Sequence, residues 1–220
     1  MFFKVENAWR RLPVEEREAG KAAFAQVVET YQQKGMIVVP CSLVGIRGDV
    51  DMMLWRISYS LEDLHTMGTA LLSTPLGHWL DVPYAYLAQA KRSTYVDKLD
   101  PDHDEGRTRV QPGRYAYNFV YPFVKTRAWY LLHKQTRQGV MDEHIQVGNK
   151  YPSVKLNTTY SFGLDDQEFV LAFESDEPGD FLDLVMELRE TEGSRFTERD
   201  TPIFTCLRKT VTEMLEALGG

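Results

Sequence analysis

A repeated turn-and-strand pattern constrains the fold of this chain more than any other feature of the sequence. Gly48-Asp49-Val50-Asp51 precedes one apolar run, and Gly163-Leu164-Asp165-Asp166 precedes another, 115 residues later. In both copies a glycine–acid turn leads into a predicted strand, and a helix that begins in an acidic segment follows. The spacing therefore predicts a chain built from two copies of one structural unit.

The elements predicted around this repeat follow the order β-α-β-β-α-β in each half, which is the ferredoxin-like order. After a short strand near 1–6, the first half is predicted to contain helix 13–34, strands 36–46 and 52–58, helix 61–79 and strand 84–91. The second half is predicted to contain strand 114–125, helix 135–151, strands 154–162 and 168–174, helix 180–195 and strand 203–209. We therefore predict an α+β fold in which tandem ferredoxin-like repeats, residues 1–96 and 114–220, form a dimeric α+β barrel within one chain. A polar segment, 97–113, is the predicted linker.

Composition excludes several classes of partner. The chain of 220 residues has a formal net charge of −7, so it lacks the basic footprint of a protein that binds nucleic acid or an anionic membrane. Its two cysteines, Cys41 and Cys206, lie far apart inside apolar runs, which indicates buried thiols rather than a disulfide framework. No apolar run reaches the roughly 18 residues of a membrane span. We predict a cytoplasmic, soluble protein.

His144 is the histidine that lies on the apolar stripe of a strongly patterned helix. Val140, His144, Val147 and Tyr151 recur at i, i+4, i+7 and i+11. An imidazole that faces a core is either a hydrogen-bonded core residue or a metal or haem ligand. Burial favours the neutral form, which is the form that binds a metal. His144 is therefore a candidate metal ligand.

A carboxylate occupies a similar position on the helix predicted over 180–195. Phe181, Val185 and Leu188 share one face of that helix, and the next position of the stripe is Glu192. Proteins hold a metal-ligating histidine by letting a carboxylate accept the hydrogen bond of its other ring nitrogen. Glu192 is thus either the partner of His144 or a solvated residue of a frayed last turn.

A set of motifs in the second half carries a resemblance to a known family. The motifs are, in chain order, Tyr121-Pro122-Phe123-Val124-Lys125, Trp129-Tyr130, His144 fifteen residues after the tryptophan, and Ser161-Phe162-Gly163-Leu164-Asp165-Asp166. In this order and spacing the chain resembles the chlorite dismutase superfamily of haem proteins, which includes the coproheme decarboxylases. The likeness extends to Trp9-Arg10-Arg11-Leu12-Pro13 and to 188–196, so it covers nearly the whole chain.

The resemblance implies an iron porphyrin, haem b or coproheme, in the second half of a tandem ferredoxin-like chain that usually assembles as a homopentamer. It implies that His144 is the proximal ligand, that Glu192 is its carboxylate partner, and that Trp129 packs against the porphyrin. Chlorite-degrading members carry an arginine about thirteen residues after the proximal histidine. Here that position is Asn157, or Leu156 if a one-residue gap before Val154 is placed differently. Neither is cationic, so chlorite decomposition is not expected.

The segment Tyr121–Lys125 favours a different reaction. Coproheme decarboxylases carry a Tyr-Pro-x-x-Lys motif, in which the tyrosine radical attacks one propionate and the lysine assists with the second. Tyr121 and Lys125 match it; without the resemblance, they would be a packed strand residue and a solvated strand end. We expect hydrogen-peroxide-dependent decarboxylation of coproheme to haem b, with coproheme as substrate and redox centre. The alternatives are a chlorite-dismutase-like haem b peroxidase with weak or no chlorite activity, which uses hydrogen peroxide or another small oxidant, and a non-enzymatic haem-binding protein.

Overall fold

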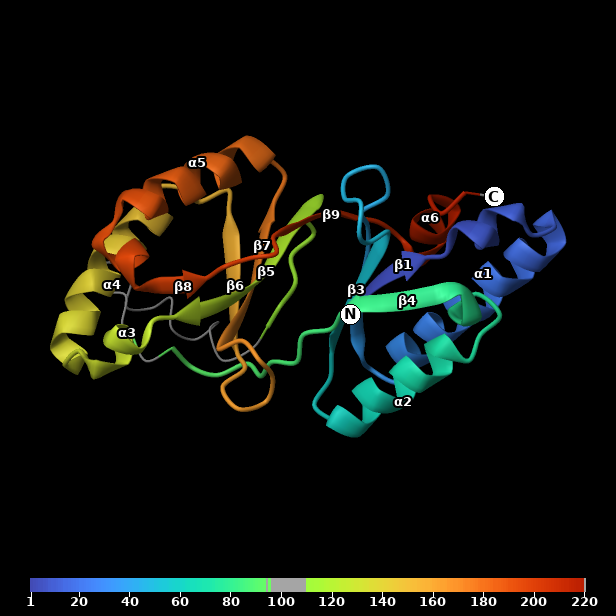
Figure 1. Ribbon diagram of the computed structural model, residues 1–220, viewed down its shortest axis with the longest axis horizontal. Coiled ribbons are helices and arrows are strands. Elements are labelled where there is room, and N and C mark those ends of the chain that lie inside the picture. The colour runs from blue at the N-terminus through green and yellow to red at the C-terminus, as the bar shows by residue number, and fades with distance from the viewer. Residues whose placement is uncertain (94, 96–109, 220) are drawn as a thin grey trace. The chain divides into compact units, whose positions relative to one another are not determined.

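Antiparallel strands covered by helices form the framework of this α+β protein, as the computed structural model shows for residues 1–93, 95 and 110–219 (Figure 1). The chain divides into two compact units. The first comprises Met1–Ala85 with Thr205–Gly220, and the second comprises Tyr86–Phe204. Most of the predicted linker, 97–109, lies outside the described residues.

The first unit follows the predicted order of elements. Its elements are β1 (Phe2–Val5), η1 (Asn7–Arg11), α1 (Val14–Gln33), β2 (Ile37–Ser42), β3 (Met52–Ile57), α2 (Leu61–Leu72), η2 (Gly77–Trp79) and β4 (Leu80–Tyr84). The strands lie in the order β4-β1-β3-β2, and β9 (Phe204–Arg208) pairs with the free edge of β2. Every pairing is antiparallel.

Large apolar side chains fill the first unit. Alternation along β3 turns Met52 and Leu54 to one face, where they join buried residues of both helices, among them Phe24 of α1 and Leu71 of α2. Each such side chain contributes about 1.5–3 kcal/mol when it leaves water. Trp9 is also fully buried, and a Cβ at Gly20 would lie only 2.8 Å from its ring. The glycine thus allows the indole to pack against α1.

The second unit repeats the strand order of the first. Its elements are β5 (Tyr117–Lys125), α3 (Arg127–Leu131), α4 (Lys134–Asn149), β6 (Lys155–Tyr160), β7 (Phe169–Ser175), α5 (Pro178–Glu190), η4 (Glu192–Phe196) and β8 (Thr197–Arg199). β5, β7 and β6 pair in that order, and β8 pairs with the other edge of β5. The spatial strand order β8-β5-β7-β6 of the second unit therefore corresponds to the order β4-β1-β3-β2 of the first.

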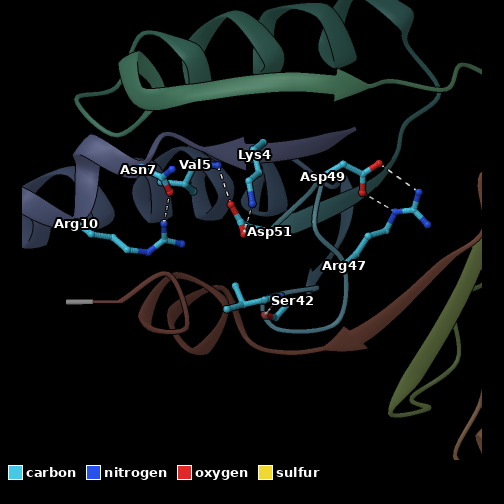
Figure 2. Close-up of polar contacts among 9 residues, drawn as sticks. Lys4, Val5, Asn7, Arg10, Ser42, Arg47, Asp49 and Asp51 are labelled. Atoms are coloured by element: carbon cyan, nitrogen blue, oxygen red, sulfur yellow. Dashed lines mark hydrogen bonds and ion pairs between the residues drawn. The ribbon is translucent and has the colours of Figure 1, made fainter.

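Acidic side chains fix the repeated turn in the first unit (Figure 2). The carboxylate of Asp51 is buried and accepts hydrogen bonds from the Val5 backbone N–H at 2.9 Å and the Lys4 ammonium at 3.1 Å. The Arg47 Nε donates to Asp49 at 2.6 Å, and this contact lowers the pKa of the Asp49 carboxyl. The acids of the motif thus tie the turn to β1 and to its own loop.

The corresponding turn in the second unit uses a glycine in the left-handed region. Gly163 has φ +72°, a conformation in which any Cβ is strained. The carboxylate of Asp165 accepts hydrogen bonds from the Leu87 backbone N–H at 2.8 Å and from the Gln167 amide at 2.9 Å. The turn therefore holds the segment that follows the first unit.

The boundary between the units differs from the predicted halves, 1–96 and 114–220. The segment from Tyr86 onward belongs to the second unit, since Gln89 pairs with Tyr160 at the edge of β6. The last predicted strand belongs with the first unit from Thr205 onward, because β9 pairs with β2. A helix that the sequence analysis did not predict, α6 (Val211–Glu216), adds Met214 and Leu215 to the first core.

Two predicted elements of the first half have other bounds. The helix predicted over 61–79 ends at Leu72, since Pro75 cannot continue the backbone hydrogen bonds of a helix. The strand predicted over 84–91 lies instead at Leu80–Tyr84. Within the described residues, no helix is long and apolar enough to cross a membrane.

Candidate functional site

One face of β5 carries the predicted motif toward the helices of the second unit. Alternation places Phe119, Tyr121, Phe123 and Lys125 on the same face of the strand. The ring of Phe119 stacks on Phe181 of α5 with centroids 3.9 Å apart. The space between this face and the helices is therefore bounded by aromatic rings, with a phenol and an ammonium among them.

His144 lies on α4 next to this aromatic face. Its imidazole is partly buried, and no described residue forms a hydrogen bond with it. Burial, helped by the positive charge of Lys125, lowers the pKa of His144 to about 4. The ring is consequently neutral at pH 7, and a nitrogen lone pair is available for a metal.

Lys125 lies close to both the histidine and the tryptophan of the motif. Its Nζ donates to the carbonyl of Gly193 at 3.2 Å and lies 4.7 Å from the ring centroid of Trp129. Burial lowers the pKa of Lys125 to about 8, although the charge of Glu168 opposes the shift. The structure thus brings Lys125, Trp129 and His144 together.

Tyr121 is a buried phenol in the middle of the same face. Its side chain is 8 % exposed, and its ring lies parallel to that of Phe173 on β7 with centroids 5.9 Å apart. Burial, with the negative charge of Asp200, raises the pKa of Tyr121 well above its ordinary value. The phenol therefore keeps its proton at neutral pH.

The register of β6 distinguishes the two candidates for the distal position. Leu156 pairs with Phe173, and residues directly opposite each other on paired strands share one face, so Leu156 lies on the Tyr121 side. Its side chain is 46 % exposed. Asn157 lies on the other face, where its amide donates to Glu174 at 2.9 Å and to the Ala172 carbonyl at 3.3 Å. Of the two alternatives that the sequence left open, Leu156 is therefore the one on the same face as Tyr121.

Glu192 does not partner His144 in the structure. Helix α5 ends at Glu190, so the stripe does not continue to Glu192, which begins the 3-10 turn η4. Its carboxylate is exposed and accepts from Arg195 at 2.8 Å. Its backbone N–H donates to the carboxylate of Glu143 on α4 at 2.9 Å. Glu192 therefore lies beside α4 but is solvated, which is the second of the two readings that the sequence left open.

A cavity of about 660 Å³ opens beside the end of β5. Its lining includes Lys125, Phe162 and Glu168, together with Arg127 and Arg199. His144, Tyr121 and Trp129 are not among the lining residues. Sequence reasoning missed this cavity, because it is formed by segments distant along the chain.

Comparisons with known proteins agree with the motif pattern. The model of the chlorite dismutase family matches residues 17–209. The chain belongs to the chlorite dismutase family. One relative, the coproheme decarboxylase of Mycolicibacterium smegmatis, is 32% identical over 196 residues, which cover 88% of this chain and 83% of the relative. The coproheme decarboxylase of Staphylococcus carnosus is 28% identical over 163 residues, 69% of this chain and 66% of its own.

Solved structures place the same fold in the chlorite dismutase family. A variant of chlorite dismutase from Candidatus Nitrospira defluvii matches with a TM-score of 0.89 and 28% identity, covering 98% of this chain and 91% of its own. A heme-binding protein from Thermus thermophilus, at 23% identity, shares the fold with a TM-score of 0.86 over 99% of this chain and 92% of its own.

The residues around His144 fit an iron porphyrin. A neutral imidazole without a hydrogen-bond partner among the described residues suits an iron ligand, and the aromatic and aliphatic cluster beside it suits a macrocycle. Several members of that cluster are only partly buried, among them Phe123, Val185 and Leu188. Apolar surface that the protein leaves incompletely covered is what a planar apolar ligand would bury.

Proposed function

We propose that this protein catalyses the hydrogen-peroxide-dependent oxidative decarboxylation of coproheme to haem b. The observation that carries the proposal is the placement of Tyr121 and Lys125 on the helix-facing side of β5, with the neutral His144 next to Lys125. Two relatives named coproheme decarboxylase, at 32% and 28% identity, support the same reaction.

His144 would hold the iron through its neutral imidazole, and Trp129 would pack beside the macrocycle. Trp129 is 2 % exposed, and its ring lies 5.4 Å from that of Phe196, so the indole has a fixed position. When bound, coproheme with peroxide supplies the oxidising equivalents of the reaction. The protein supplies position and a water-poor surrounding.

Tyr121 would transfer hydrogen between the oxidised porphyrin and a propionate. Its phenol is protonated at neutral pH, so it can give up an electron and a proton together. The tyrosyl radical would then take a hydrogen atom from the propionate side chain. A second electron would pass from that side chain to the peroxide-derived oxidising equivalents that remain, and the carboxyl group would leave as carbon dioxide. For each propionate converted to a vinyl group, one hydrogen peroxide is reduced to two molecules of water. Two propionates are converted in the full reaction.

Lys125 would attract the second propionate. With a pKa of about 8, its ammonium is mostly charged at pH 7, and a carboxylate offers it a stronger hydrogen bond than the Gly193 carbonyl does. Leu156, rather than an arginine, lies on the Tyr121 side of β6. An aliphatic side chain gives no cation to hold chlorite over the iron, which argues against chlorite decomposition.

We further propose that the two halves are tandem ferredoxin-like repeats of a dimeric α+β barrel, and that the protein forms a cytoplasmic homopentamer. The matching strand orders β4-β1-β3-β2 and β8-β5-β7-β6 support the repeat. The oligomer and the compartment rest on the family resemblance. Sedimentation velocity tests the oligomer directly.

A mixing experiment tests the reaction. Coproheme is added to the purified protein, peroxide is titrated in, and the porphyrin is identified by mass spectrometry. Loss of two carboxyl groups with formation of haem b is the expected result. Unchanged coproheme, together with oxidation of an added dye by the haem b-loaded protein, would favour the peroxidase alternative. Binding without either reaction would indicate a haem-binding protein.

A further inference from the structure

A second tyrosine of the motif region is paired with a carboxylate. The hydroxyl of Tyr130, on α3, donates to Glu168 Oε2 at 2.5 Å. The same oxygen accepts the backbone N–H of Lys125 at 2.8 Å, and the Glu168 backbone N–H donates to the Phe123 carbonyl at 3.2 Å. The carboxylate is thus fixed in the position where it can receive the phenolic proton.

This pair has the arrangement that makes a phenol easy to oxidise. Loss of an electron makes a phenol strongly acidic, so oxidation is favourable only where a base takes the proton at once. Glu168 is such a base, and it lies at hydrogen-bond distance. Burial and the hydrogen bond to Glu168 raise the pKa of Tyr130, so the proton stays on the phenol until the ring is oxidised.

Tyr130 lies near residues of both the predicted porphyrin site and the cavity at the end of β5, and Lys125 belongs to both. Its chain neighbour Trp129 has its ring centroid 4.7 Å from the Lys125 ammonium, whose charge acts on His144. The Tyr130 ring also makes a T-shaped contact with the Phe162 ring, with centroids 5.9 Å apart. Phe162 and Glu168 both line the cavity, so Tyr130 contacts two lining residues without being one itself.

The cavity has the lining of a site for a small aromatic molecule. Phe162 is 48 % exposed, which leaves a ring face or edge for stacking, and Val124 adds apolar surface. Three lining cations, Lys125, Arg127 and Arg199, are offset by four lining acids, Asp165, Asp166, Glu168 and Glu198. Mixed charge of this kind selects against a strongly anionic ligand and favours a neutral one with hydroxyl groups.

We propose that Tyr130 is a redox-active tyrosine that connects the porphyrin site to this cavity, and that the cavity binds a small phenolic one-electron donor. In the step, Tyr130 gives one electron to the peroxide-oxidised iron porphyrin and its proton to the Glu168 carboxylate. The donor then returns an electron to the tyrosyl radical, and the proton returns from Glu168. The donor leaves as its radical cation or, after it loses its own proton to water, as a phenoxyl radical. This inference rests on one part of the proposed function, namely that the protein binds an iron porphyrin that reacts with peroxide. It does not require decarboxylation.

Electron paramagnetic resonance of frozen samples tests the relay. Haem b, rather than coproheme, is loaded into the Tyr121→Phe protein, so that the other proposed radical cannot form, and peroxide is added. We expect a tyrosyl signal that Tyr130→Phe removes and that Glu168→Gln lowers by about tenfold, the factor that one unit of proton affinity represents. Tyr59→Phe is the matched control, because this fully exposed phenol lies in the first unit. An equal signal after Tyr130→Phe would overturn the relay.

A porphyrin-free measurement separates failure of the relay from failure of the proposed function. A photogenerated ruthenium(III) tris-bipyridine oxidant in solution oxidises the metal-free protein, and the tyrosyl yield is recorded. The yield should fall in Tyr130→Phe and in Glu168→Gln relative to the Tyr59→Phe control. Identical yields in Tyr130→Phe and in the unaltered protein would overturn the relay, whether or not the protein decarboxylates coproheme.

The donor site is tested by the lifetime of the radical. Hydroquinone is added to the peroxide-treated, haem b-loaded Tyr121→Phe protein, and decay of the tyrosyl signal is followed. Phe162→Ala should slow the decay by up to about tenfold, the scale of one aromatic contact. Leu164→Ala is the control, because Leu164 is 52 % exposed in the same loop but is not a lining residue. Equal decay in Phe162→Ala and the control would overturn the donor site.

Discussion

The two units of this protein share an order of strands but differ in what lies between strands and helices. In the first unit, fifteen buried residues form one apolar cluster. In the second, the corresponding cluster has six buried residues, and a larger share of its surroundings is only partly buried. The face of β5 also carries Lys125 and Tyr121, whereas β3 presents Met52 and Leu54 to its helices.

The difference shows that the same strand order can enclose a densely packed core in one unit and a proposed ligand-binding site in the other. Filling the space with Trp9, Phe24 and Leu71, all buried, stabilises the first unit. The second unit leaves apolar surface incompletely covered, which costs stability in the absence of a ligand. Binding of a porphyrin would recover that loss, because a ligand that binds only the folded state stabilises it.

Among the substitutions that test the difference between the two units, removal of the proposed iron ligand in the second unit should have the largest effect. In His144→Ala the absorption spectrum of a histidine-ligated porphyrin should be lost, because no other neutral imidazole is proposed to lie in the site. His65→Ala, an exposed histidine on α2 of the first unit, is the matched control and should leave the spectrum unchanged. An unaltered spectrum in His144→Ala would place the ligand elsewhere.

Tyr121→Phe should separate binding from reaction. The ring that packs against Phe173 remains, so affinity for coproheme should be retained, while loss of carbon dioxide should stop because no hydrogen atom can be transferred. In Lys125→Ala the mono-decarboxylated porphyrin should accumulate instead. Mass spectrometry of the porphyrin distinguishes these results. Full conversion by Tyr121→Phe would contradict the assigned role.

Truncation of core leucines should compare the two interiors directly. Leu71→Ala in the first unit should lower the free energy of unfolding by about 2–5 kcal/mol, the range for a fully buried leucine. Leu184→Ala in the second unit should cost less in the porphyrin-free protein, since the less completely filled cluster around it can adjust. Urea titration measures both. Equal losses would mean that the two cores are equally well packed.

The pH dependence of stability should report the burial of His144. Its pKa in the folded protein, about 4, lies below its ordinary value of 6.5, so the folded protein binds fewer protons. The contribution is fully present above pH 6.5 and is lost as the pH falls towards 4. The loss should be about 2 kcal/mol, allowing for partial exposure. His144→Gln should show a correspondingly flatter profile in urea titrations, and an identical profile would refute the shift.

The smallest expected effect concerns the distal position. Leu156→Arg should raise the affinity of the iron for a small anion such as fluoride by about tenfold, the strength of one charge-assisted contact. Asn157→Arg, on the opposite face, should instead destabilise the protein through overpacking beside Glu174, by about 1–3 kcal/mol. The reverse pattern would mean that Asn157 faces the porphyrin.

The sequence predicted the α+β fold and the family correctly, because both depend on local patterns. His144 lies on a helix and Tyr121 on a strand where their periodicities indicated. Glu192 was placed wrongly on the helix, since the end of α5 depends on the packing of its last turn rather than on the apolar stripe. The choice between Leu156 and Asn157 required the register with β7, which a single sequence does not contain.

Long-range contacts account for the remaining differences. Tyr130 and Glu168 lie 38 residues apart, and no periodicity joins them. The repeat assigns β9 to the second half, but in the structure β9 pairs with the edge of β2 in the first unit. The repeat pattern could not predict this pairing, because a strand of ordinary composition can pair with any free edge.

The pairing of β9 with the first unit has a consequence for folding during translation. The second unit is continuous from Tyr86 to Phe204, whereas the first unit also needs β9 and α6, among the last of the described residues to leave the ribosome. Until then, the apolar surface that Met214 and Leu215 will cover remains open on the first unit. Translation of the first unit therefore begins first, but its fold is completed last. The second unit, which carries the proposed porphyrin site, can fold before the first unit is complete.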